Sequence, residues 1–535
     1  MCRAWLSDSA FAVPVEFRVA SPAISHLIVR NVLSNSVGKI VTLGANLLLT
    51  PFVVWQIGAA NYGLLMLVGS VLMYGSLLDF GMINTIVTHV AEYRARKDDR
   101  GASAVVSTAL LLYSVAAVIA LVFSVAFAPL VPRLFNIADA DRLTAVRLVI
   151  ISGVGLSLSL PCAITTAILR GLQRYDLVSL VQIIVSSVYV LVTIAVLVLG
   201  GGVLALATAG AVAILLGQVP SLWLIGRIAP ELRITYRLAT RVMARKLLSF
   251  SSWLFVHDIA SLLQMKTDVI VIGALLPVAA VTPYALCQKL SRVPQVLTEQ
   301  FVKVLLPIAS ELKAHDDQRR LRLLYLWSSR LTLAIFVPIG LAIAMLSSDV
   351  LTLWLGRSYA EYWPLVVILV VALGIDMSQW PATNILQASA RVRLVAVVAI
   401  ATGVANLGLS IVLARWLGLN GVALGTLVPT TIASVGVLLP YAMRTLGVTS
   451  GTVAKEVMLP TVLPAIPAIL VLYLLRWSFG PLGFWALAGC ATTGVIVYAV
   501  TYVSVGASRT EQQTYRALAM NTLQFVESCF RRQAA

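Results

Sequence analysis

Residues 103–130, SAVVSTALLLYSVAAVIALVFSVAFAPL, contain no charged side chain over the length of a complete transmembrane helix. About 20 apolar residues suffice for a helix to cross a hydrocarbon core of roughly 30 Å. Similar runs recur along the 535-residue chain, which is 60% hydrophobic and only 11% charged. A soluble domain carries about 25% charged residues and cannot bury so much apolar surface. The sequence therefore predicts an all-α polytopic membrane protein.

Hydropathy predicts about fourteen transmembrane helices, of which the second and eighth are long enough to tilt, bend or protrude. The predicted spans cover residues 34–58, 62–90, 103–130, 147–168, 177–199, 203–226, 247–276, 280–309, 323–346, 362–388, 394–416, 421–443, 458–475 and 481–503.

The connecting loops alternate in charge. Loops after even-numbered spans hold twenty Lys and Arg, and the other loops hold six. The positive-inside rule then places both termini in the cytoplasm. It also accounts for the net charge of +17 without a nucleic-acid partner. The first 17 residues do not form the pattern of a signal peptide. Five scattered cysteines predict free thiols rather than a disulfide framework or a metal site.

Two pairs of segments repeat along the chain. AEYRARKDD (91–99) aligns with SELKAHDDQ (310–318) at an offset of 219, and LRGLQRYDLV (169–178) aligns with LQASARVRLV (386–395) at an offset of 217. The first pair of segments follows spans 2 and 8, and the second pair follows spans 4 and 10. The members of each pair thus hold the same place in two successive sets of six spans. We therefore expect two six-helix lobes in a pseudo-twofold arrangement about an axis along the membrane normal, with substrate bound between them.

This repeat predicts six consecutive regions. They are a cytoplasmic N-terminal segment (1–33), an N-lobe of spans 1–6 (34–227), a basic cytoplasmic linker (228–246), a C-lobe of spans 7–12 (247–445), a hairpin of spans 13–14 (446–503) and a cytoplasmic tail (504–535). No GxxxxGK[ST] sequence for nucleotide binding occurs, so energy is expected to come from gradients or from the substrate.

Polar residues form stripes on two spans when placed at 100° intervals. Such rows must face protein or a watery cavity, because a charge at the bilayer centre costs roughly 2.5–3.5 kcal/mol even on the mildest scale. Pro294 is expected to bend span 8 and free a carbonyl. The stripe on span 1 is Asn35, Lys39, Thr42, Asn46 and Thr50, and that on span 8 is Gln288, Lys289, Arg292, Gln295, Glu299 and Lys303.

Span 7 carries the stretch QMKTDVIVIG (264–273), which has two charges within an apolar helix. Asp268 shares a stripe with His257, Ser261 and Gln264, whereas Lys266 lies on nearly the opposite side. A helical ion pair needs a spacing of three or four residues. Lys266 and Asp268 are therefore expected to face different neighbours.

Several of these residues also have purely structural interpretations. Lys39 and Arg330 lie near span ends, where they could extend to the interface, and Lys303 is similar. Asp79 and Asp376 could bond helix ends or carry a coupling cation, for which H+ and Na+ are the candidates. With bases and acids of both kinds inside the spans, an anionic substrate with a polar body fits, because phosphate oxygens match Arg and Lys.

Three stretches carry a resemblance to a known family. NYGLLMLVGSVLMYGSLLDFGMINTIVTHVAEYRA (61–95) resembles the second-span signature of bacterial polysaccharide flippases. TDVIVIGALLPVAAVTPYALCQKLSRVPQ (267–295) resembles their span 7 to span 8 hairpin, and LGLNGVALGTLV (417–428) also fits. These are the O-antigen and exopolysaccharide flippases of the multidrug/oligosaccharidyl-lipid/polysaccharide exporter superfamily, and the resemblance covers about residues 34–445.

The resemblance implies a flippase, not an enzyme, that moves polyprenyl-pyrophosphate-linked oligosaccharide across the bacterial inner membrane by alternating access. Its implied partners are the lipid-linked substrate, membrane lipid, a polysaccharide polymerase and chain-length machinery. No metal or other cofactor is expected. The expected substrate-binding residues are Lys39, Asn46, Lys266, Lys289, Arg292, Gln295 and Lys303, and the gating or ion-coupling candidates are Asp79, Asp268, Glu299 and Asp376.

Two other functions compete with this one. A cation-coupled multidrug antiporter of the same superfamily would use acids such as Asp79 and Asp376, but the span count and the basic stripe on span 8 count against it. A membrane-embedded glycosyltransferase or polymerase would need catalytic residues in a large extracytoplasmic loop. The longest such loop, about 131–146, is short.

Overall fold

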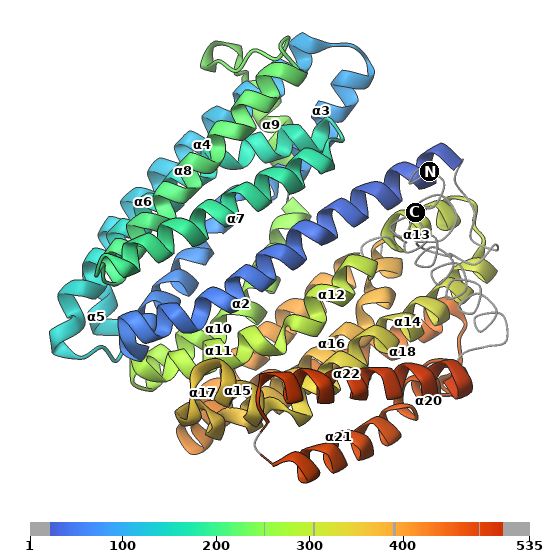
Figure 1. The fold of residues 1–535 in the computed structure, drawn as a ribbon. Helices are drawn as coiled ribbons and strands as arrows, with labels where there is room; N and C mark the ends of the chain where they lie inside the picture. The colour runs from blue at the N-terminus through green and yellow to red at the C-terminus, as the bar shows by residue number, and fades with distance from the viewer. Residues whose placement is uncertain (1–21, 251, 303–304, 389–391, 481, 507–535) are drawn as a thin grey trace, which may run out of the picture. The chain divides into compact units, whose positions relative to one another are not determined.

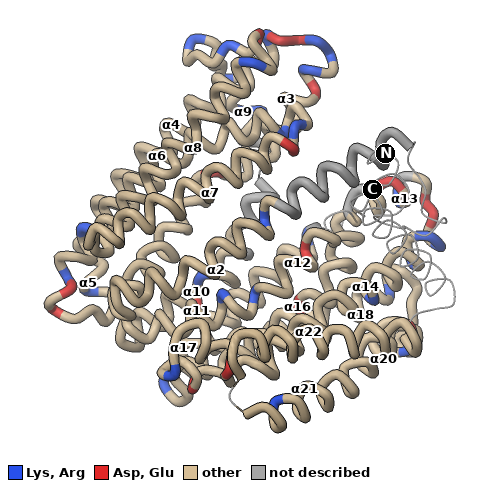
Figure 2. Tube along the Cα trace, viewed as in Figure 1, with Lys and Arg blue, Asp and Glu red and all other residues tan. Residues whose placement is uncertain are grey.

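The computed structural model describes residues 22–250, 252–302, 305–388, 392–480 and 482–506. Every regular element within these ranges is helical, which confirms the predicted all-α class (Figure 1). Figure 2 shows that most of the helix length carries neither acidic nor basic residues and that charges gather mainly near helix ends and in loops. This distribution is the one that a hydrocarbon core requires.

Ten helical segments among the described residues are long and apolar enough to cross a membrane. Gly38–Ala95 and Arg393–Leu446 each cover two of the predicted spans. The predicted spans 7 and 8 fall on α10 (Ser252–Leu275) and on the shorter helices that follow it, which are not among the ten. The chain is thus a multi-pass membrane protein, while the count of fourteen spans is not confirmed.

The chain divides into two compact units, each described here by itself. The first, the α2–α11 unit, comprises residues 34–289 and 396–430. Its elements are α2 (Pro22–Met73), η2 (Tyr74–Asp79), α3 (Met82–Ala95), α4 (Asp99–Phe127), α5 (Val131–Leu134), α6 (Arg142–Gly171), α7 (Tyr175–Val198), α8 (Val203–Ile228), α9 (Arg241–Phe250), α10, α11 (Val281–Ser291) and most of α17 (Val392–Thr431).

The described part of the second, the α12–α22 unit, comprises residues 22–33, 290–395 and 431–506, so the first residues of α2 belong to it. Its elements are α12 (Val293–Val302), α13 (Leu305–Ala314), α14 (Gln318–Met345), α15 (Ser347–Leu355), η7 (Arg357–Tyr362), α16 (Trp363–Ala388), η8 (Ile432–Leu438), α18 (Leu439–Leu446), α19 (Ser450–Val453), η9 (Ala454–Met458), α20 (Leu459–Val462), α21 (Ala465–Phe479), α22 (Phe484–Thr501) and η10 (Tyr502–Gly506). The prediction of two six-helix lobes is not tested by this division and stays a prediction.

The core of the α2–α11 unit lies among α3, α4, α6, α8 and α9. Val90 of α3, Val106 of α4 and Ile168 of α6 are completely buried, and Leu247 of α9 joins them. In the α12–α22 unit, α14 packs against α16 and also against the hairpin of α21 and α22. Small residues such as Ala468 and Gly494 allow the close approach of these helices.

Helix breaks occur where the sequence supplies glycine or proline. Residues 22–73 form one long helix with a kink at Gly58, whose φ is 80°. The next predicted span, 62–90, is interrupted after η2, where Phe80 and Gly81 adopt left-handed conformations with φ of 47° and 71°. A left-handed residue disfavours continuation of the helix. The long second span therefore bends, which is one of the three alternatives expected from its length.

Candidate functional site

The polar stripe of span 1 forms a ladder along α2. The Thr42 hydroxyl donates to the Gly38 carbonyl at 2.8 Å, Asn46 Nδ2 donates to the Thr42 carbonyl at 2.8 Å, and the Thr50 hydroxyl donates to the Asn46 carbonyl at 2.5 Å. Each bond joins residues one helical turn apart, so the side chains lie along one face. The side chain of Asn35 lies outside the described residues.

Lys289 lies against the end of this ladder. Its Nζ donates to Thr50 Oγ1 at 2.6 Å, joining α11 to α2 across 239 positions of sequence. The side chain is half-buried, and among the described residues no carboxylate pairs with it. An ammonium inside a spanning segment needs a partner. Since the ladder neighbour is a neutral hydroxyl, the charge of Lys289 remains available to an anion.

A second polar cluster surrounds Asp268 of α10. Its Oδ2 accepts hydrogen bonds from the Tyr284 hydroxyl at 2.5 Å and the Thr426 hydroxyl at 2.9 Å. Asn406 Nδ2 donates to Thr426 Oγ1 at 2.8 Å. Asp268 and Tyr284 are fully buried, and Asn406 is 2% exposed. Four polar side chains from α10, α11 and both halves of α17 thus meet inside one unit.

One acceptor of this cluster has no donor. Asn406 Oδ1 is buried and lacks a hydrogen-bond partner within the described part of the chain. A buried unsatisfied amide oxygen costs about 1–3 kcal/mol, so it marks a place where a further donor or cation would be stabilised. Among the residues that the structure describes, no three His, Cys, Asp or Glu side chains gather into a metal site. The polar groups that the cluster itself offers are carboxylate, hydroxyl and amide groups.

Glycines of the family-like stretches allow this cluster to form. A Cβ on Gly63 would lie 2.4 Å from the Val278 carbonyl oxygen, and one on Gly273 would lie 2.6 Å from Leu67. The second half of α2 therefore packs directly on the α10–α11 hairpin, where Thr282 donates to the Ala59 carbonyl at 2.5 Å. The close approach fixes α10 and α11 around Asp268.

The last part of α17 also reaches the cluster because glycines allow a close approach of the backbone. The chain turns at Gly418, where φ is 58°. A Cβ on Gly421 would lie 2.1 Å from the Leu413 carbonyl oxygen, and one on Gly425 would lie 2.2 Å from Ser410 Oγ. This spacing of four lets two helical segments touch along their backbones and brings Thr426 beside Asn406.

Asp79 has a structural partner. It ends η2 and accepts a hydrogen bond from the buried Tyr113 hydroxyl of α4. Both residues adjoin the helix break at Gly81, in agreement with a role in bonding helix ends. Tyr113 was not singled out in the sequence, because nothing in the local pattern of α4 predicts which face meets η2.

The span 8 stripe is divided between helices and units. Arg292 is the turn residue between α11 and α12, and Pro294 is the second residue of α12. Span 8, which Pro294 was expected to bend, is therefore interrupted at Arg292, two residues before the proline. Arg292, Gln295 and Glu299 belong to the α12–α22 unit, whereas Lys289 belongs to the α2–α11 unit.

The remaining candidates are dispersed. Asp376 of α16 accepts from Trp380 Nε1 at 3.0 Å within its own helix. Lys39 and Lys266 are half-buried on α2 and α10. Lys303 lies outside the described residues, as do the side chains of His257 and Ser261. Gln264, expected on the Asp268 stripe, donates to the Ala399 carbonyl at 3.1 Å and so ties α10 to α17.

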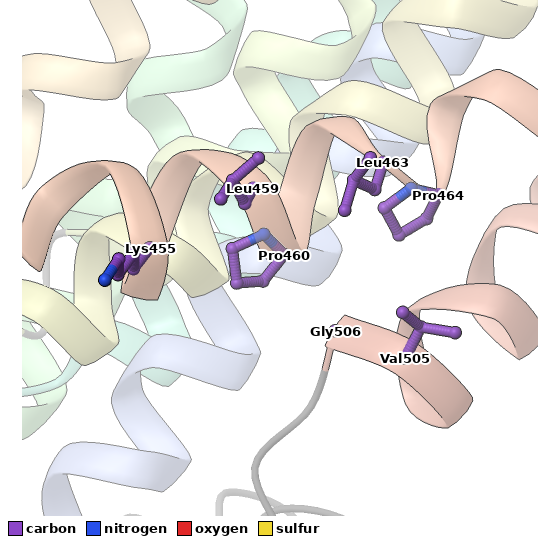
Figure 3. A pocket seen from close by; sticks show the side chains of 7 residues that line it. All are labelled: Lys455, Leu459, Pro460, Leu463, Pro464, Val505 and Gly506. Carbon is purple, nitrogen blue, oxygen red and sulfur yellow. The ribbon is translucent and has the colours of Figure 1, made fainter. Parts of the chain in front are cut away.

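A small cavity in the C-terminal hairpin contains none of these candidates. Figure 3 shows its lining, in which Lys455 of η9 is the charged residue and Pro460 and Pro464 flank the apolar wall. Its volume is about 150 Å³. A Cβ on Gly506 would lie 2.5 Å from the Pro460 carbonyl oxygen, which shows how closely η10 approaches α20. The cavity is a consequence of proline-interrupted helices rather than a polar binding site.

Solved structures of transporters share this fold. The lipid II flippase MurJ in an inward closed conformation has a TM-score of 0.69 at 15% identity, covering 88% of this chain and 98% of MurJ. An inward-facing multidrug resistance MATE family transporter of the MOP superfamily has a TM-score of 0.67 at 15% identity, covering 77% and 94%. A MOP superfamily transporter from Pyrococcus furiosus, described as having a binding pocket of reverse polarity, has a TM-score of 0.58 at 17% identity, covering 80% and 96%.

The fold, with polar clusters inside its spans, is that of a multi-pass helical membrane protein. A family model described as "Polysaccharide biosynthesis protein" matches residues 57–364, more than half of the chain. The chain belongs to this family, which confirms the resemblance seen in the sequence. No curated protein matches the chain.

Proposed function

We propose that the protein moves a polyprenyl-pyrophosphate-linked oligosaccharide across the bacterial inner membrane for surface polysaccharide biosynthesis. The observation that carries this proposal is Lys289, a half-buried ammonium held by Thr50 on the polar ladder of α2. A pyrophosphate supplies the anion that this ammonium lacks, and the amide and hydroxyl groups of the ladder suit sugar hydroxyls. The flippase likeness and the family support the same substrate class.

The other expected substrate-binding residues extend this assignment. Lys39 and Asn46 lie on the same helix as Thr50, and Arg292 follows Lys289 by three positions. Lys266, Gln295 and Lys303 complete the proposed set. Alternating access between two lobes, cytoplasmic termini and association with a polymerase and chain-length machinery belong to this proposal as well.

The Asp268 cluster is the proposed site of coupling to H+ or Na+. A carboxylate, the hydroxyl of Thr426 and the unpartnered Asn406 Oδ1 provide oxygen ligands within one unit. Hard oxygen donors suit a small cation. Asp79, Glu299 and Asp376 are the remaining gating or coupling candidates.

Deletion of the gene in its host tests the flippase function. We expect lipid-linked sugar to accumulate in the cytoplasmic leaflet and to be cleared by the wild-type gene. Lys289→Glu should fail to clear it, whereas Lys289→Arg and the loop control Arg357→Glu should succeed. Arg292→Glu extends the test to the next base of the span 8 stripe. Clearance by Lys289→Glu at normal membrane levels of the protein contradicts the cationic site.

Ion coupling is tested by Asp268→Asn with Thr426→Val as the milder variant. Uptake of lipid-linked sugar into proteoliposomes should lose its dependence on a Na+ or proton gradient in Asp268→Asn and weaken in Thr426→Val. Thr492→Val, which removes an exposed hydroxyl bonded within its own helix, serves as the control. Unchanged gradient dependence in Asp268→Asn would assign coupling to another acid.

A cation-coupled multidrug antiporter is the second candidate, favoured by the likeness to MATE transporters and by the carboxylates Asp79 and Asp376. It predicts no accumulation of lipid-linked sugar after deletion. It also predicts that the gene restores drug resistance to a sensitive strain. The two outcomes separate the functions.

A further inference from the structure

The segment that joins α8 to α10 carries a concentrated positive charge. Residues 227–248 contain six Lys and Arg and a single acid, Glu231. All six basic side chains are exposed. Glu231 pairs with Arg94 of α3 at 3.6 Å, so its charge is directed away from the segment's own arginines. Figure 2 shows basic residues gathered along this loop and α9.

Hydroxyl groups of α4 hold the backbone of this segment in place. Ser103 Oγ accepts from the Arg233 N–H at 3.1 Å, and Ser107 Oγ accepts from the Thr235 N–H at 3.1 Å. Thr108 Oγ1 accepts from the Thr240 N–H at 3.2 Å. These three hydroxyl-bearing residues are buried. The loop is therefore a fixed surface whose arginines project from a defined backbone.

The α9 helix has two distinct faces. Met243 and Leu247, one turn apart, are buried in the core of the unit. Arg241 and Arg245, also one turn apart, are exposed together with Val242, which is 81% exposed. Within the described part of the chain, neither arginine forms an ion pair with a carboxylate. Apolar and basic side chains exposed side by side are typical of helices that lie in the headgroup layer.

The segment also begins at the end of a candidate membrane span. It follows the candidate span Val203–Ile228, and Arg227 stacks over the Trp223 ring at 4.5 Å. Trp is enriched at the level of lipid headgroups. Exposed Ile234 and Tyr236 add apolar contacts within the loop. The charged surface is thus continuous with the lipid-facing part of α8.

We propose that residues 227–248 form a docking surface for anionic phospholipid headgroups. Arg237, Arg241 and Arg245 bind lipid phosphates, and Val242 and Tyr236 enter the interface between them. Guanidinium groups match phosphate oxygens, and juxtamembrane basic residues are attracted to anionic lipid surfaces. An acidic protein partner would use the charges equally, but it would not account for the continuity with a membrane span.

Native mass spectrometry of the purified full-length protein tests the proposal with phosphatidylglycerol and phosphatidylcholine as probes. We expect wild type to retain phosphatidylglycerol preferentially. The affinity of the triple variant Arg237→Gln, Arg241→Gln, Arg245→Gln should fall about a hundredfold, because each charge contributes roughly fivefold. The triple Arg→Lys variant should keep most of it. Arg133→Gln, Arg357→Gln, Arg415→Gln removes the same charge from exposed positions elsewhere in the chain and should behave as wild type.

Three results would overturn the proposal. The first is equal loss in the control triple variant, which would mean that only net charge matters. The second is displacement of phosphatidylglycerol by inorganic pyrophosphate, which would assign the surface to a soluble phosphate. The third is wild-type retention in the linker triple variant, which would leave the arginines to a protein partner. Transport activity is not the readout, so failure here is distinct from failure of the flippase function.

Discussion

Two helix connections, one in each unit, have the same backbone and different side-chain partners. Lys97 and Asp316 both adopt left-handed φ, 56° and 50°. The next residue donates its N–H to a carbonyl five positions back, Asp98 to Tyr93 at 2.9 Å and Asp317 to Leu312 at 3.1 Å. All three pairs of positions differ by 219, the offset of the sequence repeat.

The helix that follows begins in the same way at both connections. Asp98 Oδ1 accepts from the Gly101 N–H at 2.8 Å, and Asp317 Oδ1 accepts from the Arg320 N–H at 3.0 Å. These runs are therefore a helix end, a left-handed turn and an N-cap. The shared geometry supports duplication of a structural element, because the same local bonds recur at positions 219 residues apart.

The side chains around the two connections differ. Arg94 pairs with Asp99 at 2.9 Å and reaches Glu231 of the basic segment. Lys313 pairs only with the adjacent Asp316 at 3.1 Å among the described residues. The first connection is thus joined to a distant segment, whereas the ion pair of the second lies within the connection itself. A repeated backbone can acquire a separate tertiary role in one copy.

The largest effect on stability is expected at Gly101, whose equivalent in the second connection is Arg320. A Cβ on Gly101 would lie 2.4 Å from the Tyr93 ring, and Leu312 replaces that ring in the second connection. Gly101→Arg should destabilise the protein by about 2 kcal/mol through overpacking, and adding Tyr93→Leu should restore most of it. Thermal midpoints in nanodiscs measure both. A double variant no better than Gly101→Arg would show that the two copies differ for another reason.

The two N-cap residues, one in each connection, allow a matched comparison in which the expected effect on stability is intermediate. Asp98→Ala and Asp317→Ala should each lower the free energy of unfolding by about 1 kcal/mol, since each removes one hydrogen bond to an orphan helix N–H. Asp98→Asn and Asp317→Asn should be nearly neutral. The measurement is again the thermal midpoint of each variant. Clearly unequal effects of the two alanine variants would contradict the shared geometry.

The ion pairs give the smallest effect. Arg94→Gln should destabilise by about 0.5 kcal/mol and Lys313→Gln by less, because half-exposed surface pairs contribute little. The Arg94 effect should shrink at 1 M salt, where the Debye length falls to about 3 Å. Thermal midpoints at low and high salt distinguish them. An Arg94 effect independent of salt would mean that packing, not charge, joins α3 to the basic segment.

Much of the candidate site followed from local pattern. The polar stripe of α2 was predicted from spacing, because side chains one turn apart share a face in any helix. The interruption of span 8 near Pro294 was predicted because proline lacks the N–H that a continuous helix needs. Asp268 was singled out because a carboxylate inside an apolar run must have partners.

The partners themselves did not follow from the sequence. Asn406 and Thr426 were missed as site residues, although Thr426 lies in a family-like stretch and Asn406 is a polar residue in an apolar span. Neither position forms a pattern with Asp268, which is 158 residues from Thr426. Gly421 and Gly425 bring Thr426 beside Asn406, because they let the two halves of α17 touch.

The sequence by itself determined the membrane class, the helix breaks, the repeated connection and the family, because hydropathy, proline and glycine chemistry and N-caps act within a few residues. Only the tertiary structure decided that Lys289 meets Thr50, that Asp268 meets Tyr284, Thr426 and Asn406, and that Ser103, Ser107 and Thr108 fix the basic segment. Such contacts depend on which helix faces meet, and this choice is a collective property of packing between helices.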